Sequence, residues 1–588
     1  MPFGATVTSD GVDFGLWAPS ARTVEIEVDG GIVPLDAAGG GWYRHHAPHV
    51  GAGTRYRYRI EGELYVPDPA SRFNPDDVHG ASLVVDPRAF AWTDGAWRGR
   101  PWREAVVYEL HVGTFSPEGT FAGVQSRLDY LADLGVTAIE LMPLADFPGK
   151  RNWGYDGVLP FAPDASYGTP DDLRALVDAA HARNLMVLCD VVYNHFGPEG
   201  NYLHRIAQPF FTDRHKTPWG AAIDFDGGAS RPVRDFFVHN ALYWIEEFHA
   251  DGLRLDAVHA IVDDSSPDFL TELALRVREG PGREREIHLV LENDRNDAHR
   301  LARNDRGVPV AYTAQWNDDF HHVAHLLLTE ERHGYYADYA QRPLALLGRC
   351  LAEGFAFQGE ASPYRKHERR GEPSAHLPPD AFVNFLQNHD QVGNRAFGER
   401  LHALAPPALM RSFLPIFLLA PSIPLLFMGE EFAADSPFLF FADFGRDLAT
   451  AVRDGRRAEF AGFPPFDDEA KSNSIPDPGA ESTVVQSRLR WDSIAREPHA
   501  TWLRLYRELL ATRAQRIVPL LDGIVAGEAQ HHAGEQALDV MWRLRDGRAL
   551  RLAMRLMPDA PPGHARGDVI WESRPDDPWT VRWSVGHD

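Results

Sequence analysis

Residues 171–192, DDLRALVDAAHARNLMVLCDVV, hold the pattern that decides the fold. In the first part, Asp171–Arg183, apolar side chains recur three and four positions apart, which indicates an amphipathic helix. Met186–Val192 then follows as an almost continuous apolar run, which is typical of a strand buried on both faces. A helix that leads into such a strand is the repeating unit of a parallel sheet covered by helices.

The same unit recurs along most of the chain. Apolar runs predict eight strands, at Val106–Phe115, Val136–Met142, Met186–Val192, Gly252–Val258, Ile287–Glu292, Val310–Trp316, Phe382–Asn388 and Ile423–Met428. Helical periodicity between them predicts helices that include Val124–Leu134, Asp171–Arg183, Val233–His249, Phe269–Arg278 and Ala408–Leu419. Eight such strands predict an α/β protein with a closed (β/α)₈ TIM barrel rather than an open sheet.

The barrel pattern is flanked by segments of a different kind. Residues 1–95 show short alternating apolar runs separated by turn residues, which predicts an N-terminal β-sandwich of the immunoglobulin-like, carbohydrate-binding-like type. We place the catalytic barrel at 96–515, with an insertion at 193–231 and a second long connection over Gly429–Ile494. Long connections inside a compact domain are usually functional. Residues 516–588 return to short β-like runs and predict a small C-terminal β-domain.

Composition narrows the classes of function. The formal charge of −25 excludes a basic face for nucleic acid or anionic membrane and favours a neutral substrate, although a solvated acidic surface explains it equally. The sequence has no apolar stretch of membrane-spanning length, and its start does not resemble a signal peptide. Cys189 and Cys350 form no disulfide framework, and Cys189 lies in an apolar run as expected of an inert buried thiol. We therefore expect a soluble, cytoplasmic protein.

Metal and cofactor motifs are missing from the sequence. It has no CxxC pair, no HExxH helix and no GxxxxGK[ST] loop. We therefore expect neither a metal ion nor an organic cofactor.

Charged and imidazole side chains stand where several predicted strands end. They are Asp190 and His195 after the third strand, Arg254 and Asp256 after the fourth, Glu292 after the fifth, and His389 and Asp390 after the seventh. Because side chains at the carboxyl ends of barrel strands face the active-site mouth, a closed barrel would bring all of them together. Taken singly, each Asp could be a helix cap and each His an interior residue. The convergence of the whole set favours a site.

The carboxylates of this set suit complementary tasks. Arg254 and Asp256 are two apart on one strand and so share a face, where a guanidinium favours the ionised carboxylate that a nucleophile needs. Arg254 could also serve only to neutralise Asp256. Glu292 ends an apolar run, where burial near other carboxylates would raise its pKa as a general acid requires. Such a pair is what retaining glycoside cleavage uses.

Four segments of the chain resemble the motifs of the α-amylase superfamily: Asp190–His195, Gly252–His259, Glu292 with its preceding strand, and Asn388–Asp390. The resemblance implies that Asp256 is the nucleophile, Glu292 the acid/base and Asp390 a third essential carboxylate. It also implies that Arg254, His195 and His389 hold the sugar and that Asp190 ties the site together. Trp153–Gly157 resembles a loop in which a tyrosine, here Tyr155, stacks on that sugar; loop packing is the alternative.

Other segments discriminate among members of the superfamily. Gly11–Pro19 looks like the sandwich that precedes the barrel in branching and debranching enzymes, and Tyr108–Phe115 is similar to branching enzymes and trehalohydrolases alike. Segments that resemble the maltooligosyltrehalose trehalohydrolases are Gly197–Leu203, Thr217–Gly220, Asp224–Gly227, Glu292–Asp297 and Gln315–His322. This resemblance implies hydrolysis of the α-1,4-glucosidic bond next to the terminal trehalose of maltooligosyltrehalose, with release of trehalose. A branching transferase and a non-catalytic glucan-binding homologue are the alternatives.

The long connections supply further candidates for sugar contacts. Trp219, Phe438, Phe440 and Phe441 could form aromatic walls, with simple packing as the alternative. Glu430 follows the eighth strand and could bind sugar hydroxyls, with capping or structural pairing as the alternative.

Overall fold

The computed structural model describes residues 1–217, 220–460, 473–557 and 567–587, and its centre is a closed barrel of eight strands. All neighbouring barrel strands pair in parallel, including the first with the last. The strands are β10 (Val107–Leu110), β11 (Ala138–Leu141), β14 (Met186–Val191), β17 (Gly252–Leu255), β18 (His288–Leu291), β19 (Ala314–Trp316), β22 (Phe382–Phe385) and β23 (Ile423–Phe427). The predicted (β/α)₈ fold is therefore confirmed.

Several predicted strands were too long at their carboxyl ends. The first was predicted to reach Phe115, but the strand ends at Leu110 and α1 (Val112–Phe115) follows as a helical turn, in which the backbone N–H of Phe115 bonds to the carbonyl of His111. The seventh ends at Phe385, and α10 (His389–Gly393) begins at the predicted site histidine. The reason is common to both: the chain must leave the barrel wall to present side chains at its mouth.

Helices cover the outside of the barrel as the sequence pattern requires. They include α3 (Leu128–Leu134), α4 (Pro170–His181), α6 (Ser230–Glu247), α7 (Phe269–Glu279), α8 (Asp318–Thr329), α9 (Pro343–Glu353), α12 (Pro407–Leu418) and α16 (His499–Thr512). Local sequence fixes where they begin: at α4, Thr169 and Asp172 form a reciprocal capping box ahead of Pro170 at the first helical position. The helix α3 ends at Gly135, whose φ of 102° needs a residue without Cβ.

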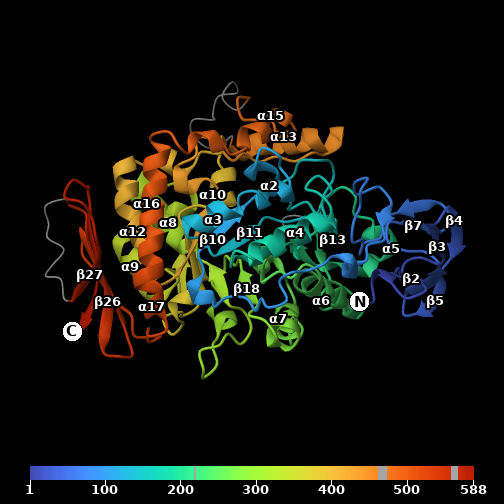
Figure 1. Cartoon of the computed structure of the whole chain (residues 1–588), viewed down its shortest axis with the longest axis horizontal. Coiled ribbons are helices and arrows are strands. Elements are labelled where there is room, and N and C mark those ends of the chain that lie inside the picture. Colours follow the sequence, from blue (N-terminus) through green and yellow to red (C-terminus); the bar gives the residue numbers. More distant parts are fainter. Residues whose placement is uncertain (218–219, 461–472, 558–566, 588) are drawn as a thin grey trace.

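Two β-domains flank the barrel at opposite ends of the molecule (Figure 1). The N-terminal one has two antiparallel sheets, in the orders β1-β2-β6-β5 and β4-β3-β7-β8. Their strands are β1 (Gly4–Val7), β2 (Gly11–Trp17), β3 (Val24–Val28), β4 (Gly31–Pro34), β5 (Asp36–Gly39), β6 (Trp42–Pro48), β7 (Arg55–Ile60) and β8 (Leu64–Val66), with β9 (Ser82–Leu83) beside β7. This domain is fixed to the barrel where Arg72 pairs with Glu247 of α6 at 2.7 Å.

The C-terminal domain is one antiparallel sheet in the order β24-β25-β26-β28-β27. Its strands are β24 (Gln530–Ala533), β25 (Ala537–Arg543), β26 (Arg548–Arg555), β27 (Asp568–Glu572) and β28 (Thr580–His587). The indole N–H groups of Trp542 and Trp583 donate to backbone carbonyls of α9 and α12, at 3.2 and 2.9 Å. The divisions at about residues 95 and 515 stay a prediction.

The two long connections carry structure of their own. The first holds α5 (Leu203–Ile206) and a hairpin of β15 (Phe211–Thr217) and β16 (Gly220–Ile223). The second holds α13 (Arg446–Phe460) and α15 (Glu481–Ser487), at the top of the view in Figure 1. Within the described residues, no helix has both the length and the apolar character that crossing a membrane requires.

Candidate active site

The buried guanidinium of Arg254 is the centre of the candidate site. Its side chain is fully buried on β17, and its Nη1 donates to Asp190 Oδ2 at 2.7 Å and to Asp256 Oδ1 at 2.8 Å. Its Nη2 lies 3.3 Å from Glu292 Oε2. Three carboxylates predicted from three different strand ends therefore meet around one positive charge. The positive charge of Arg254 offsets part of the free-energy cost of burying these carboxylates close to one another.

Glu292 is the proposed catalytic acid whose surroundings raise its pKa. Its Oε2 accepts a hydrogen bond from the backbone N–H of Ala257 at 2.5 Å. Burial raises its pKa to about 8; Arg254 opposes this, and the charges of Asp256 and Asp390 add to it. Glu292 is therefore protonated at neutral pH, as a general acid must be.

The three acids remain open to solvent to different degrees. The exposed fractions of their side chains are 13% for Asp256, 17% for Glu292 and 40% for Asp390. Asp390 is the second residue of α10, and the side chain of Asn388 accepts from its backbone N–H and caps the helix. A ligand at the barrel mouth can thus reach all three.

The rings of Tyr155 and Trp153 both contact the imidazole of His389. The Tyr155 ring stacks on His389 with centroids 4.9 Å apart, and its hydroxyl donates to Asp190 Oδ2 at 2.7 Å. The neighbouring Trp153 stacks on Phe438 and donates its indole N–H to the carbonyl of Leu439 at 2.9 Å. Tyr155 is thus fixed among the site residues rather than packed away in the loop.

On the other side, the third strand end contributes an amide that the sequence reasoning did not single out. Asn194 Nδ2 donates to Asp256 Oδ2 and to the backbone carbonyl of Asp256, both at 2.9 Å. Its Oδ1 is hydrogen-bonded to the ring of His195. Burial lowers the pKa of His195, so this ring is neutral near pH 7. The position of Asn194 inside the motif Asp190–His195 was the signal that could have found it.

The structure does not bring Glu430 into this group. Glu430 is buried, and its carboxylate accepts from Gln387 Nε2 at 3.2 Å and from the Tyr506 hydroxyl of α16 at 3.0 Å. Its hydrogen bonds therefore join the barrel to α16. This is structural pairing, which the sequence left open as an alternative to binding sugar hydroxyls. Phe438 and Phe441 are also buried in the core, whereas Phe440 is partly buried against Trp153. Trp219 lies outside the described residues.

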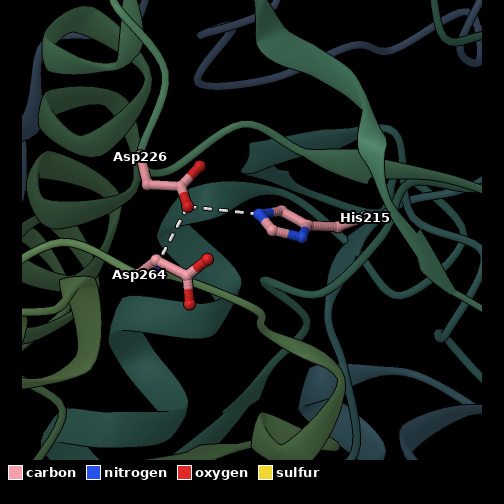
Figure 2. Close-up of side chains that lie close together, drawn as sticks. All are labelled: His215, Asp226 and Asp264. Atoms are coloured by element: carbon pink, nitrogen blue, oxygen red, sulfur yellow. Dashed lines mark hydrogen bonds and ion pairs between the residues drawn. The ribbon is translucent and has the colours of Figure 1, made fainter.

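One cluster in the described part of the chain has the residue types of a metal site. One ligand atom each of His215, Asp226 and Asp264 lies within 4.8 Å of the others (Figure 2). However, Asp226 Oδ2 already interacts with His215 Nε2 at 3.1 Å and accepts from the backbone N–H of Asp264 at 3.0 Å, and Arg214 donates to Oδ1 at 2.5 Å. These contacts anchor the β15–β16 hairpin to the loop that follows β17, and the charge of Arg214 opposes a second cation there.

Comparison with known proteins places the chain in a family. The model of the alpha-amylase catalytic domain matches residues 84–241. The malto-oligosyltrehalose trehalohydrolase of Deinococcus radiodurans is 45% identical over 522 residues, which cover 88% of this chain and 82% of that protein. The 1,4-alpha-glucan branching enzyme of Frankia casuarinae is 38% identical, but over 45% of this chain and 35% of its own length.

Among solved structures, a protein from Salmonella typhimurium matches over 100% of this chain and 99% of its own, with a TM-score of 0.93 and 43% identity. The whole architecture, including both flanking β-domains, is thus shared with that protein. The chain belongs to the malto-oligosyltrehalose trehalohydrolase family, whose members are glycoside hydrolases with an alpha-amylase catalytic barrel.

Proposed function

We propose that this chain hydrolyses the α-1,4-glucosidic bond next to the terminal trehalose of a maltooligosyltrehalose and releases trehalose with retention of the α configuration. The observation that supports this chemistry is the contact of one buried guanidinium, Arg254, with both Asp256 and Glu292. It holds the two carboxyl groups side by side at the barrel mouth, while burial, against the opposing charge of Arg254, raises the pKa of Glu292 to about 8. The substrate follows from the family to which the chain belongs.

In the first step, the Asp256 carboxylate attacks C1 of the glucose that precedes trehalose. The C1–O4 bond breaks, and the proton of Glu292 moves to the departing O4, so that trehalose leaves as a neutral sugar. The glucan is then bound to Asp256 through an acyl acetal, and Glu292 is ionised. Water takes the place of trehalose.

In the second step, Glu292 accepts a proton from that water as its oxygen attacks C1. The bond to Asp256 breaks, the shortened glucan leaves with a hydroxyl on C1, and both carboxyl groups return to their first state. Two inversions at C1 give net retention.

The remaining residues either bind the sugar ring between these two groups or position the side chains that do. Tyr155 and His389 provide a stacked surface, and Asp390, the most exposed of the acids, accepts hydrogen bonds from sugar hydroxyls. Asn194 holds the Asp256 carboxylate in place for attack. Asp190 acts through Arg254 and Tyr155, because its Oδ2 accepts a hydrogen bond from both side chains.

Product analysis tests the proposal. Purified protein incubated with maltotriosyltrehalose is expected to yield trehalose and maltotriose, and the Asp256→Ala variant is the control for a contaminating glucosidase. A folded protein that releases no trehalose would reject the assignment. If amylose instead gains α-1,6 branches and loses iodine colour without new reducing ends, the chain is a branching transferase. If Glu292→Gln changes no activity on either substrate, it is a glucan-binding homologue.

A further inference from the structure

A buried carboxylate that contacts His389 has no role in the steps above. Glu109 lies on β10, and its side chain is 1% exposed. Its Oε1 lies 2.5 Å from Nδ1 of His389, and its Oε2 accepts from the backbone N–H of His389 at 3.0 Å. One carboxylate thus holds the ring and the backbone of the same residue.

These two contacts determine how the imidazole ring is oriented. A carboxylate can only accept, so Nδ1 carries the proton and Nε2 points away from Glu109. That nitrogen lies 3.5 Å from Asp390 Oδ1, at the open end of the barrel. Burial alone would lower the pKa of His389, but the charges of Asp390 and Glu109 raise it to about 9. Both ring nitrogens are therefore protonated at neutral pH.

The other neighbours of the ring allow this arrangement. Tyr155 covers one face, and Trp153 and Trp316 lie with ring centroids 5.6 and 6.1 Å away. The charge of Arg254 opposes protonation, and the imidazole of His111 is kept neutral because burial lowers its pKa to about 4. Glu140 lies in register with Glu109 on β11, and burial raises its pKa well above the ordinary value, which favours its uncharged form. Among these groups, Glu109 is the charged side chain that directly contacts Nδ1 of the His389 ring.

We propose that Glu109 is a positioning residue that clamps His389 through its ring and its backbone, so that a charged N–H at Nε2 faces the sugar hydroxyls in the proposed cleavage position. The inference rests on the proposed function, because His389 acts on a sugar only if the site binds one. In this proposal Glu109 does not contact the substrate, but it sets the charge of His389, which does.

The size of the effect follows from the protonation of His389. If Glu109→Gln returns the pKa of His389 from about 9 to the ordinary ~6.5, the protonated fraction at pH 8 falls from about 90% to about 3%, roughly 30-fold. At pH 6 the same change in pKa lowers the protonated fraction of His389 by only about a quarter. The activity ratio of variant to wild type should therefore fall by at least tenfold between pH 6 and pH 8. Titration of Glu292 affects both proteins and cancels in that ratio.

The matched control is Glu140→Gln, which makes the same substitution on the neighbouring strand, in a buried side chain whose raised pKa favours the uncharged form. The primary measurement is the titration of His389 by NMR of protein labelled with ¹³C at histidine Cε1, with its signal assigned from the His389→Gln variant. We expect the midpoint to fall by at least one pH unit in Glu109→Gln and to move by less than ~0.3 in Glu140→Gln. Glu109→Asp, which keeps the charge, should give an intermediate midpoint.

An unchanged midpoint in Glu109→Gln, or an activity loss that is equal at pH 6 and pH 8, would overturn the proposal and leave Glu109 as packing. If Glu109→Gln does not fold, the titration midpoint of His389 in Glu109→Asp is measured instead. A lowered midpoint then supports the proposal, and an unchanged midpoint overturns it. The titration needs no substrate, so a wild-type enzyme inactive on maltotriosyltrehalose would reject the proposed function without affecting this result.

Discussion

Replacing Glu292 by glutamine removes the proposed proton donor while the shape of the side chain stays nearly the same. Burial raises the pKa of Glu292 to about 8, so at neutral pH glutamine replaces an uncharged acid. Glutamine also retains an oxygen that can accept from the backbone N–H of Ala257, as Glu292 Oε2 does at 2.5 Å. We therefore expect the variant to fold and to melt within a few degrees of the parent.

The expected loss of activity follows from the proton transfer alone. General acid–base catalysis contributes typically ~10²–10⁴-fold, which is about 3–5 kcal/mol at ~1.4 kcal/mol for each factor of ten. Glu292 serves in both steps, so we expect kcat on maltotriosyltrehalose to fall by at least ~10³. Fluoride leaves without protonation, so formation of the glycosyl-enzyme from α-maltosyl fluoride should fall by less than about tenfold.

The assay compares initial rates of trehalose release with the burst of fluoride release, and Glu279→Gln, an exposed position at the end of α7, is the control. The result that refutes the reasoning is an equal loss on both substrates, because Glu292 would then matter for something other than proton donation. A loss below tenfold on maltotriosyltrehalose would refute it as well.

Further predictions concern the nucleophile, the stereochemistry, the pH profile and the loop of Tyr155. Asp256→Ala should lose at least ~10³ in kcat and keep its melting temperature within a few degrees, as measured by trehalose release and circular dichroism. Maltotriose released by the wild type should be the α anomer in early proton NMR spectra; a β anomer would indicate inversion. Since Glu292 acts as an acid below its pKa of about 8, kcat/KM should fall about tenfold per unit as pH rises above it, and a profile flat to pH 10 would contradict this. Gly154→Ala should lower both activity and melting temperature, because Gly154 has a φ of 107° and a Cβ would meet the Pro143 carbonyl at 2.2 Å; Gly53→Ala, with φ 87° and no atom within 4 Å, isolates the cost of φ alone.

The sequence predicted the barrel because its pattern is local. Each strand is an apolar run bounded by a helix with its own period, so Met186–Val191 could be identified without its neighbours. The same locality made Asp190, Arg254 and Asp256 visible as a set, since each stands at the end of such a run. Strand ends were less accurate, because where the chain leaves the barrel wall depends on contacts with other segments.

Tertiary structure alone separated two carboxylates that look alike in the sequence. Asp390 and Glu430 both follow a barrel strand, yet Asp390 is 40% exposed at the mouth and Glu430 is buried against Tyr506 of α16, a helix about seventy residues further along the chain. Glu109 shows the converse: in its apolar run it gave no sign of a role, and only barrel closure brings β10 beside the start of α10 and His389. Sequence periodicity thus determined which residues form strands and helices. The partner that each buried polar or charged side chain meets was decided by packing between segments far apart in the chain, because such a group is stable in the interior only with a partner that the folded chain supplies.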